Sequence, residues 1–263
     1  MQINRLLSYE IHDIIYEVEK VTKTCFFWGK VVQNMKSFSA IKNFISRYKH
    51  GFILLYFFVY LIWFFKLEHT VTTHFNKIYS KLDDYIPFCE VFIIPYFLWF
   101  LYIAVTILFF LFASRNDFYK LCANLFIGMT ICLIIYTIWP NGHNLRVDLH
   151  SLGRTNIFTQ LLSYVYTVDT ATNVFPSIHV FNSIAAYIAI KKNEQLKKHK
   201  WIQNSALILT TLICMSTVLL KQHSILDILG AVALNIAMYF IVYVPDWKKI
   251  FEARRARREL SNI

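Results

Sequence analysis

The 263-residue sequence shows neither the paired cysteines nor the secretory signal that are typical of small secreted proteins. Its five cysteines show neither close pairing nor a C-x-x-C spacing, so we expect no structural disulfide. No short apolar run is followed by a small-residue cleavage site, so we expect no secretory signal. The sequence also lacks the alternating segments of about ten residues that form membrane β-barrels, and it shows no internal repeat and no second soluble domain. Helices are therefore the expected structure.

Apolar side chains dominate the composition. Hydrophobic residues make up 57% of the chain, aromatic residues 17%, and the mean hydropathy is +0.44, values that exceed those of most soluble domains. A helix that spans a bilayer needs about 20 mainly apolar residues. Apolar runs cover residues 52–65, 86–113, 119–139, 177–190, 202–220 and 224–244. We predict an all-α integral membrane protein, a six-helix bundle whose first and fourth helices are short.

The positive charges are distributed unevenly between the predicted loops. Of the 27 Lys and Arg residues, 21 lie in the segment before the first run, the loops after the second and fourth runs, and the C-terminal tail. Cytoplasmic loops carry such an excess, so we expect a multi-pass protein of the cell membrane with both termini in the cytoplasm. The net charge of +11 then reflects topology and contact with anionic lipid headgroups, and we expect no nucleic-acid partner.

Three regions follow from this pattern. In residues 1–50, apolar residues recur at helical spacing between charged ones, which indicates an amphipathic helix on the cytoplasmic interface or one packed on the end of the bundle. Residues 51–245 form the membrane bundle. Residues 246–263 form a basic cytoplasmic tail that anchors the topology.

Two histidine segments stand where apolar runs meet loops on the predicted outer face. His223 and Asp227 are four residues apart, so on one helix face the carboxylate can hold the ring and raise its basicity. Such a histidine can act as a nucleophile toward phosphorus or as a general base. A structural polar pair that caps one helix against the next is the alternative.

The second segment contains Pro176, Ser177, Ile178 and His179. Proline suits the first turn of a helix and leaves the following amides free to face an anion such as phosphate. His179 would then lie beside the bound group and could protonate a leaving alkoxide. The alternative is that His179 is a lone histidine at the membrane interface with no catalytic role.

Taken together, the two segments resemble the second and third motifs of the type 2 phosphatidic acid phosphatase (PAP2) superfamily, P-S-G-H and S-R-x5-H-x3-D. The six-helix organisation fits this family as well. The resemblance implies that His223 attacks phosphorus to form a phosphohistidine, that Asp227 orients it and that His179 protonates the leaving group. It also implies that Ser177 contacts the phosphoryl oxygens, and it implies no metal and no other cofactor.

The sequence departs from the family pattern at three places. Thr217 replaces the arginine of the third motif, and Lys221, one turn further along the same helix face, is expected either to supply a charge to the phosphate or to reach the membrane interface. The first motif of the family has no exact match in this sequence. Arg146 is the cation that comes nearest to it, and we assign Arg146 either to phosphate binding or to pairing with Asp148. Ile178 replaces glycine and reshapes the pocket.

We therefore expect a membrane phosphatase that acts on a lipid phosphate, of the phosphatidic acid or isoprenoid diphosphate type, at the extracytoplasmic face. A phosphotransferase similar to inositol phosphorylceramide or sphingomyelin synthases is the main alternative, because a diester needs less positive charge than a monoester. A non-catalytic lipid-binding protein is a further alternative. A zinc site formed by His143, Asp148 and His150 is a rival interpretation, and the lack of a third strong ligand in this spacing argues against it. The sequence does not predict an oligomeric state.

Overall fold

A computed structural model describes residues 43, 45–71, 74–247 and 249–250 of the chain. The chain divides into two compact units, Met1–Gly51 and Phe52–Ile263, and the second contains the candidate site described below. The predicted amphipathic helix and most of the basic tail lie outside the described residues, so both stay predictions.

The described part of the second unit is almost entirely helical, as predicted. Its helices and strands are η1 (Lys49–Leu55, which begins in the first unit), α3 (Tyr56–Thr70), β1 (Asn76–Lys77), α4 (Leu82–Tyr85), η2 (Glu90–Phe92), α5 (Ile93–Ala113), α6 (Arg115–Ile138), β2 (Asn141–Gly142), α7 (Ile157–Val168), α8 (Ile178–Lys192), η3 (Leu196–Lys198), α9 (Lys200–Leu219) and α10 (Ile225–Val242).

Among the residues that the structure describes, five helical segments are long and apolar enough to cross a membrane. They are Ile45–Thr70, Glu90–Ala113, Arg115–Ile138, Lys200–Leu219 and Ile225–Val242. The prediction that the first helix is short is wrong, because its segment continues N-terminally to Ile45. The fourth predicted helix, α8, is short: its 15 residues reach about 22 Å, less than the hydrocarbon thickness of about 30 Å. The chain is an all-α membrane bundle.

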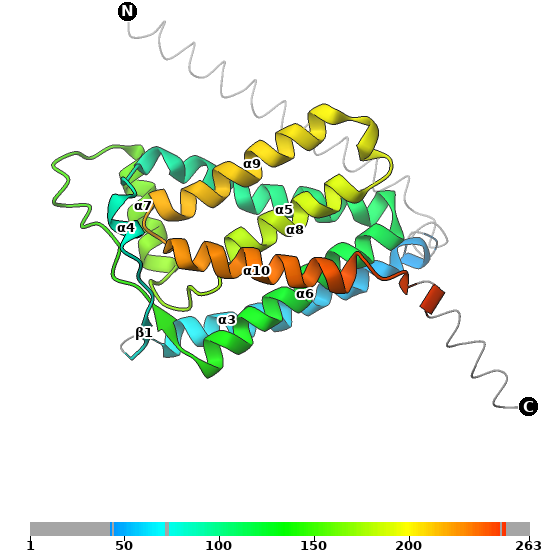
Figure 1. Cartoon of the computed structure of the whole chain (residues 1–263), viewed down its shortest axis with the longest axis horizontal. Coiled ribbons are helices and arrows are strands. Elements are labelled where there is room, and N and C mark those ends of the chain that lie inside the picture. The colour runs from blue at the N-terminus through cyan, green and yellow to red at the C-terminus, as the bar shows by residue number, and fades with distance from the viewer. Residues whose placement is uncertain (1–42, 44, 72–73, 248, 251–263) are drawn as a thin grey trace, which may run out of the picture. The chain divides into compact units, whose positions relative to one another are not determined.

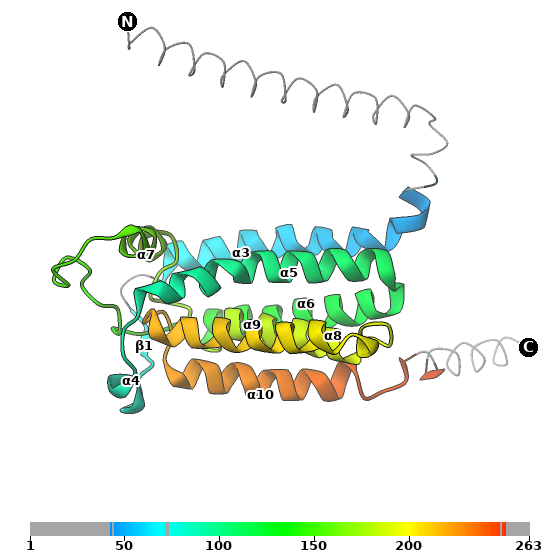
Figure 2. The ribbon, with the colours of Figure 1, turned by 90° about the horizontal axis from the view of Figure 1, so that it is seen from above.

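The long helices run side by side, and α8 lies among α5, α6, α9 and α10 (Figures 1 and 2). Its burial is allowed by a close approach to α6. A Cβ atom at Gly128 of α6 would lie 1.9 Å from the ring of Phe181, so only glycine lets this ring pack against the α6 backbone. Phe181 is fully buried, and the central helix is thereby fixed against its neighbour.

One end of the bundle carries the non-spanning elements α4, α7 and β1 (Figure 1). Helix α7 was not predicted. It starts at a capping box in which Asn156 and Thr159 bond each other's backbone amides. Strands β1 and β2 pair in parallel, with Asn76 opposite Asn141. The end of α9 and the start of α8 lie at this same end, as expected for two histidine segments on one membrane face.

Candidate functional site

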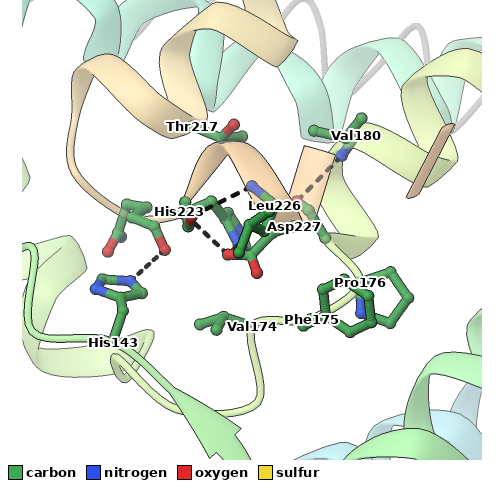
Figure 3. Close-up of polar contacts among 12 residues, drawn as sticks. His143, Val174, Phe175, Pro176, Val180, Thr217, His223, Leu226 and Asp227 are labelled. Carbon is green, nitrogen blue, oxygen red and sulfur yellow. Dashed lines mark hydrogen bonds and ion pairs between the residues drawn. The ribbon is translucent and has the colours of Figure 1, made fainter. Parts of the chain in front are cut away.

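His223 and Asp227 form a buried hydrogen-bonded pair. Nδ1 of His223 lies 3.1 Å from Oδ2 of Asp227, which also accepts the backbone N–H of Ser224 at 2.9 Å (Figure 3). Asp227 is fully buried and His223 is 7% exposed. Since the carboxylate accepts, Nδ1 carries the proton and Nε2 keeps its lone pair. The ring is therefore held in the tautomer that a nucleophile needs.

The end of α9 sets the position of His223. The carbonyl of Thr217 accepts the N–H of Gln222 at 2.9 Å and that of His223 at 3.0 Å, while the Thr217 hydroxyl donates to the Cys214 carbonyl. These bonds satisfy carbonyls at the helix end and turn the chain toward α10. Thr217 thus shapes the turn with its backbone, and its own side chain faces the α9 backbone.

The structure does not bring Lys221 to the histidines. Helix α9 ends at Leu219, and Lys221 has a left-handed φ of 56°, so the prediction that it continues the face of Thr217 is wrong. Its Nζ donates instead to the carbonyls of Asp83 at 2.8 Å and Ile86 at 2.6 Å. Partial burial lowers the pKa of Lys221, and Asp83 and Asp84 oppose this effect.

Asp83 contacts the segment between His223 and Asp227, which the sequence did not reveal. Its carboxylate accepts the Ser224 hydroxyl at 2.7 Å and the Ile225 N–H at 2.8 Å, and it is 1% exposed. An acidic side chain at a helix N-terminus satisfies free amides and complements the helix dipole. Asp83, on α4, therefore fixes the first turn of α10, which carries Asp227.

The start of α8 differs in part from the predicted anion site. The helix begins at Ile178, and Ser177 is its N-cap, with Oγ accepting from the Val180 N–H at 3.4 Å (Figure 3). The Ser177 N–H donates to the Asp227 carbonyl at 3.2 Å, so this amide is not free for an anion, contrary to the prediction. Ser177 is fully buried. Its bonds connect α8 directly to α10.

His179 packs among aromatic rings beside the dyad. Its ring centroid lies 5.9 Å from that of His223, in an edge-to-face arrangement, and 4.4 Å from Trp99 and 4.8 Å from Tyr96 on α5. In the described part of the chain no hydrogen bond to the His179 ring is found. The packing fixes the ring's position, and the ring nitrogens are left for a ligand.

Both histidines line a cavity of about 50 Å³. Its apolar wall is formed by Phe64, Tyr136, Val174 and Ile178. Its polar wall is formed by Glu68, Asp169, Thr170, Thr172, Asn173 and Gln222. No Lys or Arg is among these lining residues. The site that the sequence predicted for a phosphate therefore has two carboxylates on its wall.

Arg146 contacts two residues of the polar wall, Asp169 and Gln222, and is not itself among the lining residues. Its guanidinium donates to the carbonyls of Tyr166, at 2.7 Å, and of Asp169, and to Oε1 of Gln222 at 2.7 Å. It also lies over the Tyr166 ring. Burial lowers the pKa of Arg146, and the negative charge of Asp169 opposes this effect. Of the two predicted roles, pairing with Asp148 is not seen. Arg146 orients two residues of the cavity, Asp169 and Gln222.

His143 supports the same loop. Its Nε2 lies 2.6 Å from the Gln222 carbonyl, and its Nδ1 accepts the Leu145 N–H at 3.1 Å (Figure 3). Burial lowers the pKa of His143 to about 4. Both ring nitrogens are engaged, whereas Asp148 and His150 are exposed. The described residues contain no group of three or more His, Cys, Asp or Glu side chains placed to hold a metal.

The second half of the chain matches the model of a known protein family. The model of the PAP2 superfamily matches residues 154–251, which include both histidine segments. Residues 1–153, which contribute Glu68, Asp83 and Arg146, lie outside the matched range. No curated protein and no solved structure matches the chain.

Proposed function

Since this chain belongs to the PAP2 superfamily over residues 154–251, we propose that it is a membrane enzyme that transfers the phosphoryl group of a lipid phosphate through His223. Members of this superfamily are phosphatases and phosphotransferases, so a lipid-related function of this type holds for the chain. The observation that carries the proposal is the buried His223–Asp227 bond at 3.1 Å, with the His179 ring beside it in one cavity.

The proposed reaction has two steps, formation and hydrolysis of a phosphohistidine. In the first, Nε2 of His223 attacks phosphorus, the bond from phosphorus to the leaving oxygen breaks, and His179 gives that oxygen its proton. Asp227 stabilises the positive charge that the ring gains. In the second step, His179 takes a proton from water, whose oxygen displaces His223 and releases phosphate. We propose hydrolysis of a phosphatidic acid or isoprenoid diphosphate at the extracytoplasmic face as the activity.

The charge of the cavity favours a second candidate. Glu68 and Asp169 line it, and the Arg146 guanidinium, which is not among the lining residues, donates through Nη1 and Nη2 to two carbonyls and to Gln222. A phosphomonoester dianion is repelled by such a wall more strongly than a phosphodiester, which carries a single charge. Transfer of the phosphoryl headgroup of a diester lipid to an alcohol acceptor is therefore the alternative.

Purified protein distinguishes the two activities when it is assayed for release of free phosphate from lipid phosphates and for transfer of a labelled headgroup to an alcohol. We expect one activity in the wild type and its loss in His223→Ala. Activity that is indifferent to His223→Ala would refute catalysis by this site. A matched control is His150→Ala, which removes an exposed histidine outside the cavity.

A further inference from the structure

We propose that the polar wall of the cavity, formed by Glu68, Asp169 and Asn173, binds a primary ammonium group of the substrate. The substrate is then a phosphate ester of an amino alcohol. This inference rests on the proposed function for its place in the reaction. It narrows the lipid phosphates of that proposal to those that carry an ammonium group, in place of phosphatidic acid and isoprenoid diphosphates, which carry none.

Glu68 presents a buried carboxylate to the cavity. One of its oxygens, Oε2, accepts from the backbone and hydroxyl of Thr170, and the other, Oε1, accepts from Asn173 Nδ2 at 3.0 Å. Both oxygens accept hydrogen bonds, an arrangement that an ionised carboxylate allows. Glu68 is 5% exposed, and a buried charge needs an opposite charge close by. Within the described chain, no ion pair of Glu68 with a Lys or Arg is found.

Asn173 provides an independent indication that this wall accepts hydrogen bonds from a ligand. Its Nδ2 donates to Glu68, which fixes the orientation of the amide and makes Oδ1 the opposite, accepting end. This Oδ1 is buried and has no hydrogen-bond partner among the described residues, although the residue is only 5% exposed and lines the cavity. A buried acceptor without a partner is destabilising, so a ligand that donates to it gains affinity.

Asp169 adds a second carboxylate with a free oxygen. Its Oδ2 accepts the Tyr96 hydroxyl at 2.5 Å and lies 3.5 Å from Gln222 Nε2. No described donor reaches its Oδ1. The wall thus offers acceptors and negative charge, and a primary ammonium has three N–H donors, no acceptor and a positive charge. A quaternary ammonium has no N–H to give, and a hydroxyl does not neutralise the carboxylates.

The test compares soluble headgroup phosphates that share the same phosphate. Thermal unfolding of the purified full chain is followed against O-phosphoethanolamine, phosphocholine and sn-glycerol 3-phosphate, in the wild type and in His223→Ala. A ligand that binds the folded state raises the melting temperature, which gives its dissociation constant. We expect O-phosphoethanolamine to bind at least about tenfold more tightly than the other two compounds, in both proteins.

Neutralising the wall should abolish this preference. In Glu68→Gln and in Asp169→Asn we expect the ratio of the dissociation constants to fall to about one. Asp84→Asn, which removes an exposed carboxylate outside the cavity, should keep it. Because the ratio is measured within one variant, a loss of stability does not mimic the result. Equal binding of the three compounds by the wild type would overturn the proposal, and so would stabilisation by Mg²⁺ or Ca²⁺ alone that Glu68→Gln removes.

Failure of the subsite and failure of the function give different results. If turnover requires His223 but the ammonium compound has no advantage, the subsite is refuted and the phosphoryl transfer stands. If the ammonium compound is preferred in both proteins but no lipid is turned over, the catalytic proposal is refuted and the subsite stands.

Discussion

Replacing Asp227 by asparagine tests whether the dyad acts in catalysis or only joins two segments. The substitution keeps the shape of the side chain and its position under His223 and Ser224. It removes the negative charge beside the ring. If His223 takes up the phosphoryl group, its ring becomes positively charged during the reaction, and the loss of charge at residue 227 raises the barrier.

The size of the effect follows from the geometry. Nδ1 and Oδ2 are 3.1 Å apart, so the charge centres of the ring and the carboxylate lie about 4 Å apart, and their attraction is about 4 kcal/mol at an effective dielectric constant of about 20. A neutral hydrogen bond to the amide oxygen returns about 1 kcal/mol. The remaining difference of about 3 kcal/mol corresponds to about a hundredfold loss of kcat.

The measurement is kcat and KM of Asp227→Asn in detergent, with the lipid that the wild type turns over. Asp246→Asn is the matched control, since it makes the same chemical change at a carboxylate outside the cavity that pairs with Lys249. We expect kcat to fall and KM to change little, because the charge acts mainly in the transition state. A fall of less than about threefold in a folded variant would mean that the pair is structural.

Two further predictions concern the loop around His223. Burial holds the pKa of His143 at about 4, below the ordinary 6.5, so the unfolded chain binds the proton first and stability that is complete above pH 6.5 is lost as the pH falls to about 4. This loss amounts to about 3 kcal/mol, and His143→Gln should flatten the dependence of the melting temperature on pH between 7.5 and 4.5; an equally steep dependence in the variant would contradict it. Lys221→Met should lower the melting temperature by about 2–6 °C with turnover per folded molecule retained, because Nζ holds the carbonyls of Asp83 and Ile86; lost turnover at an unchanged melting temperature would return Lys221 to phosphate binding.

The helices of the bundle could be predicted because a segment in lipid must satisfy all its backbone hydrogen bonds internally. Each such segment therefore forms a helix within a long apolar run. Helix α7 was missed, since its 12 residues are too few to span a membrane and carry polar side chains. Its start was nevertheless encoded, because Asn156 and Thr159 form a capping box that the sequence displays. Local signals therefore mark this helix, while hydropathy alone does not.

Spacing also predicted contacts within one turn of helix. His223 and Asp227 are four residues apart and form the predicted hydrogen bond, but His223 precedes the N-cap Ser224, so the bond spans the start of α10 and does not join two residues on one helix face. The prediction for Lys221 used the same rule and is wrong, since the rule holds only while the helix continues and α9 ends two residues earlier. The roles of His223 and Asp227 in catalysis stay predictions.

Contacts between distant segments could not be read from the sequence. Asp83 lies 141 residues before Ser224, and its hydrogen bond to that hydroxyl depends on how the loops at one end of the bundle fold together. Glu68 belongs to an apolar helix, in which its charge suggests an interface position. Only the structure shows that it faces a cavity with Asn173, 105 residues away.

The proposed ammonium subsite would explain the missing arginine and the acidic wall together, through the charge of the substrate. A site for a phosphomonoester dianion needs cations around the phosphate, and here Thr217 stands in the third motif while Arg146 is bound to carbonyls. A phosphate ester that carries its own ammonium group brings a counter-charge with it. Glu68 and Asp169 then attract that group and hold the phosphate at His223, so the carboxylates that weaken binding of phosphatidic acid strengthen binding of an amino-alcohol ester.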